Sequence, residues 1–209
     1  MSVLYKLASM QDRRDEEPNK DLAKEFVDRK DIEGIREIAE NLWNKDKKIQ
    51  GDCDSVMEEI GRNAPELIEE YVADFLKLLS SKNNRRVWGA MINLSLIADR
   101  KPKEIFESFE SISKTIENGS VITRDNGIKT LAIVASKEEE YNQVIFPFLI
   151  QQLKTCRPKS VPQYAESIFC AVKSDNREQY IDVLNQRLDI LTSSQQIRVK
   201  KLLRKLQEL

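Results

Sequence analysis

Histidine, the side chain most often used for acid–base catalysis, is absent from this chain of 209 residues. Without imidazole there is no Ser-His or Cys-His nucleophile, no histidine general base and no mixed histidine and carboxylate metal site. Any catalysis would rest on carboxylates, lysines or tyrosines. The sequence also has no glycine-rich phosphate loop, nucleophile elbow or calcium-binding loop. We therefore expect a protein that is not an enzyme and that uses no cofactor and no metal.

The three cysteines are the remaining candidates for metal or redox chemistry. Cys53, Cys156 and Cys170 are odd in number and have no CxxC spacing, which argues against a disulfide framework and a structural zinc site. We expect reduced thiols, most of them buried. Acidic residues also cluster over residues 51–59 (GDCDSVMEE), but this segment lies within a predicted helix and lacks the glycine of a calcium loop. It is interpreted as solvated helix surface.

The overall composition favours a helical protein with almost no net charge. Lys and Arg total 34 against 35 Asp and Glu, so net charge attracts neither nucleic acid nor an anionic membrane. Hydrophobic residues make up 40% and there are only six Gly and six Pro, which suits helices better than turn-rich sandwiches. No stretch approaches the roughly 18 apolar residues of a membrane span, and MSVLYKLASM lacks the apolar core of a signal peptide. We expect a cytoplasmic protein without membrane contact.

Apolar and small residues recur with a period of 37 residues. Four columns share steps of 37, 37 and 38 residues: Met57, Leu94, Leu131 and Phe169; Ile60, Ile97, Val134 and Val172; Leu79, Ile116, Leu153 and Leu191; and the small residues Cys53, Ala90, Gly127 and Ala165. Coincidence does not account for four columns in one register. The small residues would let neighbouring helices approach closely.

Each period resolves into two amphipathic helices, because apolar residues follow at steps of three and four. The pattern predicts first helices over 46–62, 84–99, 121–136 and 161–174, and second helices over 66–80, 103–118, 139–154 and 177–192. The same register predicts a second helix over 31–45 and a final first helix over 194–209. Pro65 and Pro102 suit the first turns of second helices, and Asn83 and Ser120 lie at junctions between units.

The N-terminal 19 residues precede the repeat. Residues 12–20 (DRRDEEPNK) read as a solvated linker, because they are almost entirely charged. Before them, Val3, Leu4 and Leu7 are spaced to form a short helix folded onto the first unit. Residues 1–19 are thus predicted to be an N-terminal helix and linker, and residues 20–209 a single repeat domain.

The segment from Phe75 to Asp99, FLKLLSSKNNRRVWGAMINLSLIAD, resembles the junction of a HEAT repeat. It has an apolar second helix, a short polar turn, a basic residue, and then a helix alternating small and aliphatic residues, a pattern that armadillo repeats share. Where the family commonly has an acid in the turn, this chain has Lys82, Asn83 and Asn84, so it departs from the usual Asp to Arg ladder. The resemblance implies an all-α superhelix, a HEAT-like solenoid of about five helical pairs in which each pair completes its neighbour's core.

The resemblance also implies that second helices line the concave side of the stack, where a partner protein or peptide would bind. Segment 66–79 holds four acids and one base, and segment 103–118 four acids and two bases, which favours a basic or mixed-charge partner. We predict a non-enzymatic scaffold whose binding surface includes Glu70, Lys77, Glu107, Lys114, Gln151 and Asp182. The alternative is that these residues form ordinary solvated helix faces.

Basic residues gather instead at the starts of first helices: Lys47, Lys48, Arg85, Arg86 and Arg124. Such a ridge beside helix N-termini could hold phosphates, although the same residues also suit a purely structural role at the junctions. Trp43 and Trp88 allow either packing or nucleobase stacking. HEAT-like DNA alkylation-repair glycosylases carry aromatics and a catalytic carboxylate in their groove, but neither tryptophan here has a carboxylate one turn on. A nucleic-acid-associated protein related to them is the second functional hypothesis.

Overall fold

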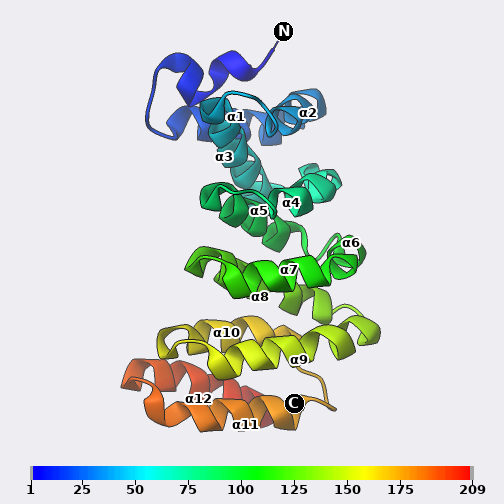
Figure 1. Ribbon diagram of the computed structural model, residues 1–209, viewed down its shortest axis with the longest axis vertical. Coiled ribbons are helices and arrows are strands. Elements are labelled where there is room, and N and C mark those ends of the chain that lie inside the picture. The colour runs from blue at the N-terminus through cyan, green and yellow to red at the C-terminus, as the bar shows by residue number, and fades with distance from the viewer. Residues whose placement is uncertain (1, 208–209) are drawn as a thin grey trace. The chain divides into compact units, whose positions relative to one another are not determined.

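The chain divides into two helical units, each with more contacts inside it than to the other. The structure is a computed structural model that describes residues 2–207, so residue 1 of the predicted N-terminal segment and residues 208 and 209 of the predicted last helix lie outside it. Within the described range the chain contains helices and no strand (Figure 1). The units span Met1–Ile105 and Phe106–Leu209, and their boundary falls inside the short helix α6, Pro102–Glu107. We describe each unit by itself.

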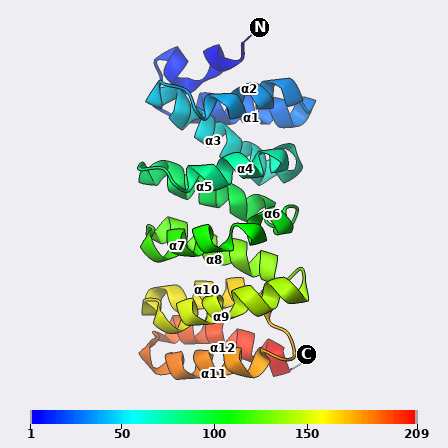
Figure 2. The ribbon, with the colours of Figure 1, turned by 45° about the vertical axis from the view of Figure 1, so that its right-hand side comes forward.

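The first unit is built on a row of three first helices. Its helices are α1 (Glu17–Arg29), α2 (Ile32–Asn41), α3 (Lys47–Asn63), α4 (Val72–Leu78) and α5 (Asn84–Ile97), followed by the start of α6. Helix α3 packs between α1 and α5, while α2 packs on α3 and α4 packs on α5 (Figures 1 and 2). Apolar side chains fill the space between α1, α3 and α5 and the helices α2 and α4 that pack on them.

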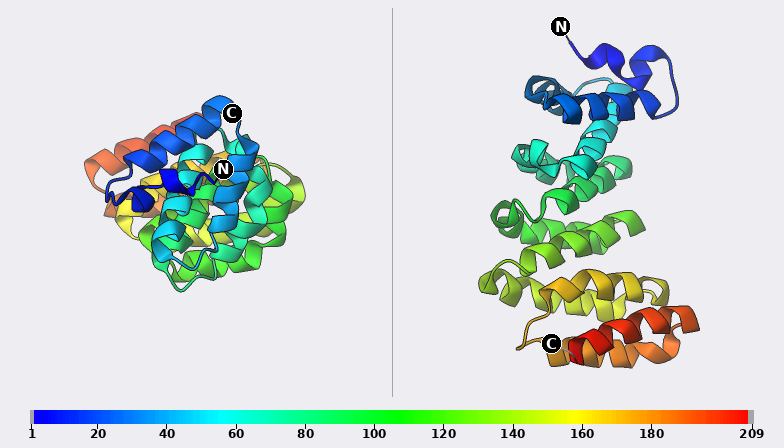
Figure 3. Two further views of the ribbon diagram at one scale, coloured as in Figure 1. Left: turned by 90° about the horizontal axis from the view of Figure 1, so that it is seen from above. Right: turned by 180° about the vertical axis from the view of Figure 1, so that it is seen from behind.

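The second unit repeats this arrangement. Its helices are α7 (Phe109–Asn118), α8 (Val121–Ala135), α9 (Glu139–Thr155), α10 (Val161–Ile168), α11 (Arg177–Arg187) and α12 (Ser193–Gln207). Helix α10 packs between α8 and α12, α7 and α9 pack on α8, and α11 contacts α9 and α12 (Figure 3). None of the described helices is long and apolar enough to cross a membrane.

Polar side chains begin the first helices at the predicted junctions. The Asn83 side chain accepts the Arg85 N–H at 3.0 Å, and Ser120 Oγ accepts the Thr123 N–H at 3.2 Å. Each bond satisfies one of the backbone donors that a helix leaves unpaired at its start, which is why these residues fix where α5 and α8 begin. Pro102 occupies the first position of α6, as predicted.

The repeat columns lie in the core, which confirms the register. Met57, Leu94 and Leu131 have no exposed surface, and neither have Ile60, Ile97 and Val134. The fourth members of these two columns are only half-buried, because α10 ends at Ile168, earlier than predicted. Phe169 lies in a 3₁₀ turn and Val172 is extended. The predicted helix over 161–174 is therefore too long.

The second helices are less regular than predicted. Segment 66–80 begins with two 3₁₀ turns before α4, segment 103–118 is broken at Ser108 between α6 and α7, and segment 177–192 ends in a 3₁₀ turn after α11. The predicted helix over 31–45 stops at Asn41. Except at Ser108, the local backbone tightens to i→i+3 hydrogen bonds, a common way for a helix to start or finish.

The N-terminal segment is more ordered than a linker. Two 3₁₀ turns, Leu4–Lys6 and Ala8–Gln11, pack on α1, and the second also packs on α3 (Figure 3). Leu7 is fully buried, so the expected contact with the first unit is present. The linker prediction is wrong from Glu17 onward, because α1 starts there with Pro18 in its first turn.

Packing between α3 and α5 should be sensitive to side-chain volume. We expect Ala90→Leu to lower the free energy of unfolding by about 1–3 kcal/mol, because Ala90 is buried and the added atoms have no space. The neighbouring substitution Gly89→Ala is the control. A Cβ at Gly89 meets no atom within 4 Å, so this change should raise stability by roughly 0.5–1 kcal/mol. Urea denaturation followed by circular dichroism tests both, and equal effects would contradict the register.

Candidate functional site

An open groove of about 700 Å³ lies in the second unit, over α7 and α9. Its position follows from the break at Ser108, where the chain leaves α6 and starts α7 without a side-chain cap. The residues that give the groove its character are two aromatics, an exposed valine, two acids and a lysine: Phe106, Phe109, Val144, Glu107, Glu110 and Lys114. The groove therefore combines an apolar floor with a charged rim.

Aromatic contacts hold the floor of the groove in place. Phe106 stacks on Tyr141 with ring centroids 4.2 Å apart, and Phe109 meets Phe148 edge-on at 5.8 Å. Both geometries are favourable for aromatic pairs. Val144, on α9, leaves 46% of its surface exposed within this setting. Phe106 and Phe109 are half-buried beside it, so the three side chains form one small apolar patch rimmed by polar groups, a character that binding surfaces share.

The rim of the groove carries three charged side chains that form no ion pair with other described residues of the protein. Glu107, Glu110 and Lys114 are exposed, and none of them forms an ion pair within residues 2–207. Two carboxylates beside one ammonium group give the groove an acidic bias. Such a rim favours a partner that brings a basic side chain to the acids.

The structure places two of the six predicted partner-binding residues in this groove, Glu107 and Lys114. Gln151 on α9 and Asp182 on α11 are exposed in the same unit but do not line it. Glu70 and Lys77 belong to the first unit and are exposed there. Lys77 Nζ lies 4.3 Å from the ring centroid of Trp43, a cation–π contact. Phe106 and Phe109 were not predicted, although two aromatics three residues apart beside acids could have marked them.

Three of the five predicted ridge residues converge in the first unit. Lys47, Lys48 and Arg85 are exposed and line one cavity of about 670 Å³, together with Arg13 and Arg14 of the N-terminal segment. Arg124 belongs to the second unit. Its guanidinium donates hydrogen bonds to the carbonyl oxygens of Gly119 and Glu117, and so serves the end of α7.

Arg86 is a correction to the predicted ridge, because its side chain is buried. Arg86 Nε donates to Asp54 Oδ2 at 2.9 Å, and its terminal nitrogen donates to the Leu42 carbonyl oxygen. Burial raises the pKa of Asp54, while the hydrogen bond from Arg86 acts in the opposite direction. Arg86 therefore joins α5 to α3 and the end of α2 and is not available to a ligand.

The tryptophans lie in different settings. Trp43 is partly exposed, and its Nε1 donates to Asp74 at 3.0 Å. Trp88 is half-buried and lines a smaller cavity of about 200 Å³ between α3 and α5, where its Nε1 has no hydrogen-bond partner. Gly51 and Gly89 line the same cavity, and a Cβ on either would meet no atom within 4 Å. The surface of α3 and α5 beside Trp88 therefore has free space next to both glycines.

The cysteines are free thiols, and only Cys53 is buried. The expectation that most are buried is therefore wrong, because Cys156 is half-buried and Cys170 is exposed. Burial raises the pKa of Cys53 to about 12 and that of Cys156 to about 11, so both are protonated at neutral pH. Within the described part of the chain, no three His, Cys, Asp or Glu residues cluster in a way that could hold a metal ion.

Comparison with known proteins defines the fold class. Neither a protein-family model nor a curated protein matches the sequence. Among solved structures, an engineered protein covers 100% of this chain and 98% of its own, with a TM-score of 0.70 at 18% identity. A designed armadillo repeat protein in complex with the peptide (KR)4 covers 91% of this chain and 92% of its own, with a TM-score of 0.71 at 14% identity. Computationally designed armadillo repeat proteins for modular peptide recognition give a TM-score of 0.67 at 14% identity, over 90% of this chain and 91% of theirs.

These likenesses and the helical repeat agree on one class. The chain has the fold of an armadillo- or HEAT-type helical repeat protein, an all-α superhelix, as the sequence resemblance implied. At identities below one fifth, the likeness is one of fold.

Proposed function

We propose that the chain is a non-enzymatic scaffold that binds a segment of a partner protein, and that the groove over α7 and α9 is part of the binding surface. The observation that carries this is the apolar floor of the groove, where the half-buried Phe106 and Phe109 lie beside the exposed Val144 and next to two acids that form no ion pair within residues 2–207. Two of the similar solved structures support it, because their names describe peptide binding by designed armadillo repeats. Gln151 and Asp182 would extend the surface along α9 and α11, and Glu70 and Lys77 would form a separate contact surface on the first unit.

The chemistry of the groove specifies its occupant. An apolar side chain of the partner would lie on Phe106, Phe109 and Val144, where burial removes water from all of them. A basic side chain next to it would meet Glu107 or Glu110. We therefore propose an extended peptide in which a large apolar residue adjoins lysine or arginine.

Fluorescence anisotropy with a labelled peptide of alternating Lys and Leu residues tests this proposal. We expect the charge reversals Glu107→Lys and Glu110→Lys together to weaken binding at least about tenfold, since like charges now face each other. Phe109→Ala should weaken it by a similar factor through loss of apolar contact.

The matched control is Glu138→Lys with Glu140→Lys, two exposed acids at the start of α9 that lie outside the groove. These changes alter the net charge equally and should leave affinity within about twofold if the groove is the site. Equal weakening by both pairs would show that only overall charge is sensed, and would contradict the proposal.

The second hypothesis, nucleic-acid association, is supported by the convergence of Lys47, Lys48 and Arg85 with two further arginines. It is weakened by the burial of Arg86 and by the use of Arg124 on backbone carbonyl oxygens. Steep salt-sensitive binding to a generic DNA duplex, lost when Arg85 and Arg124 are neutralised, would favour it. Undetectable duplex binding at low salt would remove it.

A further inference from the structure

Five basic side chains of the first unit line a cavity beside the N-terminal segment. The cavity has a volume of about 670 Å³ and lies where that segment passes the starts of α3 and α5. Arg13 and Arg14 line it from the segment, Lys47 and Lys48 from α3, and Arg85 from α5. Three parts of the chain that are far apart in sequence thus bring five cationic groups to one space.

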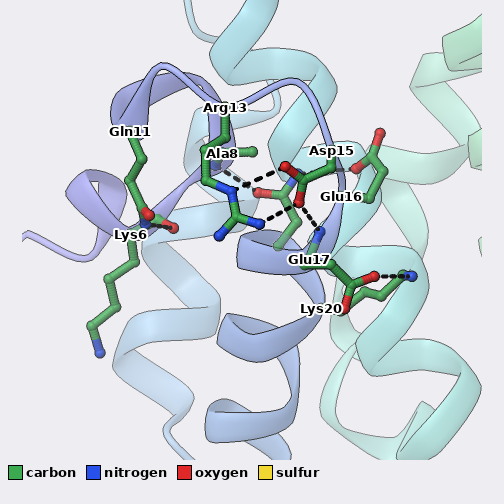
Figure 4. A network of polar contacts seen from close by, with 9 residues as sticks. Lys6, Ala8, Gln11, Arg13, Asp15, Glu16, Glu17 and Lys20 are labelled. Atoms are coloured by element: carbon green, nitrogen blue, oxygen red, sulfur yellow. Dashed lines mark hydrogen bonds and ion pairs between the residues drawn. The ribbon is translucent and has the colours of Figure 1, made fainter.

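Three of the four acids that line the cavity accept hydrogen bonds from other groups of the protein. Asp15 accepts two hydrogen bonds from the guanidinium of Arg13, at 2.7 and 3.0 Å (Figure 4). Glu16 accepts a hydrogen bond from Arg85 at 3.1 Å. Asp52 accepts the Ser9 N–H at 2.8 Å and an amide N–H of the buried Asn19 at 2.9 Å.

The residues that line the cavity comprise five cations and four acids, so the wall has a net charge of +1. Within residues 2–207, Arg14, Lys47 and Lys48 form no ion pair, and among the acids of the wall Asp12 and Asp52 form none. Ser9 also lines the cavity, but its Oγ is buried and has no hydrogen-bond partner. The wall therefore presents three cations without an ion-pair partner to a ligand in the cavity: Arg14, Lys47 and Lys48.

We propose that this cavity binds a compact oligophosphate, a ligand that carries two or more linked phosphate groups. Several cations around one volume match several closely spaced negative charges, whereas one phosphate would leave most of them unused. A nucleic-acid duplex fits less well, because the cations surround one cavity of about 670 Å³, which a double helix cannot enter. This proposal is independent of the peptide groove in the second unit.

Calorimetric titration of the full chain with sodium tripolyphosphate, at low ionic strength and without divalent cations, tests the proposal. We expect saturable binding with one site, at least about tenfold tighter than for orthophosphate. The double variant Lys47→Gln with Lys48→Gln should weaken it by at least about tenfold, and Arg14→Gln should also weaken it. These side chains are exposed, so the variants should remain folded, and circular dichroism verifies this.

The matched control is Lys24→Gln with Lys82→Gln, which removes the same charge from exposed positions of the first unit outside the cavity. This control should keep its affinity within about twofold. Bound oligophosphate should also slow tryptic cleavage after Arg13 and Arg14, a readout that a distant charge effect does not produce. Absent binding, equal weakening in the control, or tighter binding of a DNA duplex than of tripolyphosphate would each overturn the proposal.

Discussion

Replacing Arg86 by methionine should lower the free energy of unfolding by about 3–5 kcal/mol, the range expected when one partner of a buried ion pair is removed. The change leaves Asp54, whose side chain is only 17% exposed, without its guanidinium partner. It also leaves the Leu42 carbonyl oxygen without the hydrogen bond that Arg86 donates. Urea denaturation, followed separately by circular dichroism and by tryptophan fluorescence, measures the loss, since a repeat array need not unfold in one step.

The adjacent residue supplies the control for this prediction. Arg85 has the same charge and the same helix, but its side chain is 68% exposed and its pair with Glu16 is solvated. Arg85→Met should therefore change stability by no more than about 1 kcal/mol. The double variant Arg86→Met with Asp54→Leu should recover much of the loss, because no buried charge is then left unpaired. Equal losses for Arg85 and Arg86 would contradict the buried role of Arg86.

Truncating Leu131 to alanine should cost about 2–5 kcal/mol in the second unit. Leu131 lies in the middle of α8 and has no exposed surface, so its removal leaves a cavity that α8 and its neighbours cannot easily fill. Ile122→Ala on the same helix is the comparison, because Ile122 is largely outside the core and should cost far less. Thermal denaturation by circular dichroism ranks the two. A similar melting temperature for both would contradict the placement of the first repeat column in the core.

The repeat could be predicted because burial repeats. Each unit must fill the same space between helices, so Met57, Leu94 and Leu131 recur at the same step and reveal the register without any structure. The caps at Asn83 and Ser120 were predictable for a similar reason, since a helix start requires an acceptor. Buried positions and helix starts that recur in each helical pair can therefore be predicted from the sequence.

Interactions that occur once leave no such trace. The buried Asn142 donates to the carbonyl oxygens of Ala135 and Ala171 and accepts a hydrogen bond from Asn176 at 2.8 Å. This network joins the end of α8, the start of α9 and the turn after α10, yet in sequence it is two polar residues among many. Arg86 is a similar case, since its type suggested a surface and its burial depends on Asp54, which lies 32 residues earlier.

The candidate groove also has one part that the sequence predicted and one part that it did not. The exposure of Glu107 and Lys114 followed from helical periodicity, and the structure confirms it. The hollow between them did not follow, because it depends on the break at Ser108 and on how Phe106 stacks on Tyr141. Periodicity predicts which face a residue occupies, whereas the shape of that face depends on where a helix is interrupted.

The N-terminal turns have a consequence for the stability of the helices beneath them. Leu7 is fully buried and Ala8 nearly so, and the turns on either side pack on α1, the second one also on α3. Lys6 pairs with Glu25 of α1, and the Ser9 N–H donates to Asp52 of α3. Removing residues 2–11 would return this apolar surface to water and break both polar contacts, so the first unit should unfold at a lower urea concentration.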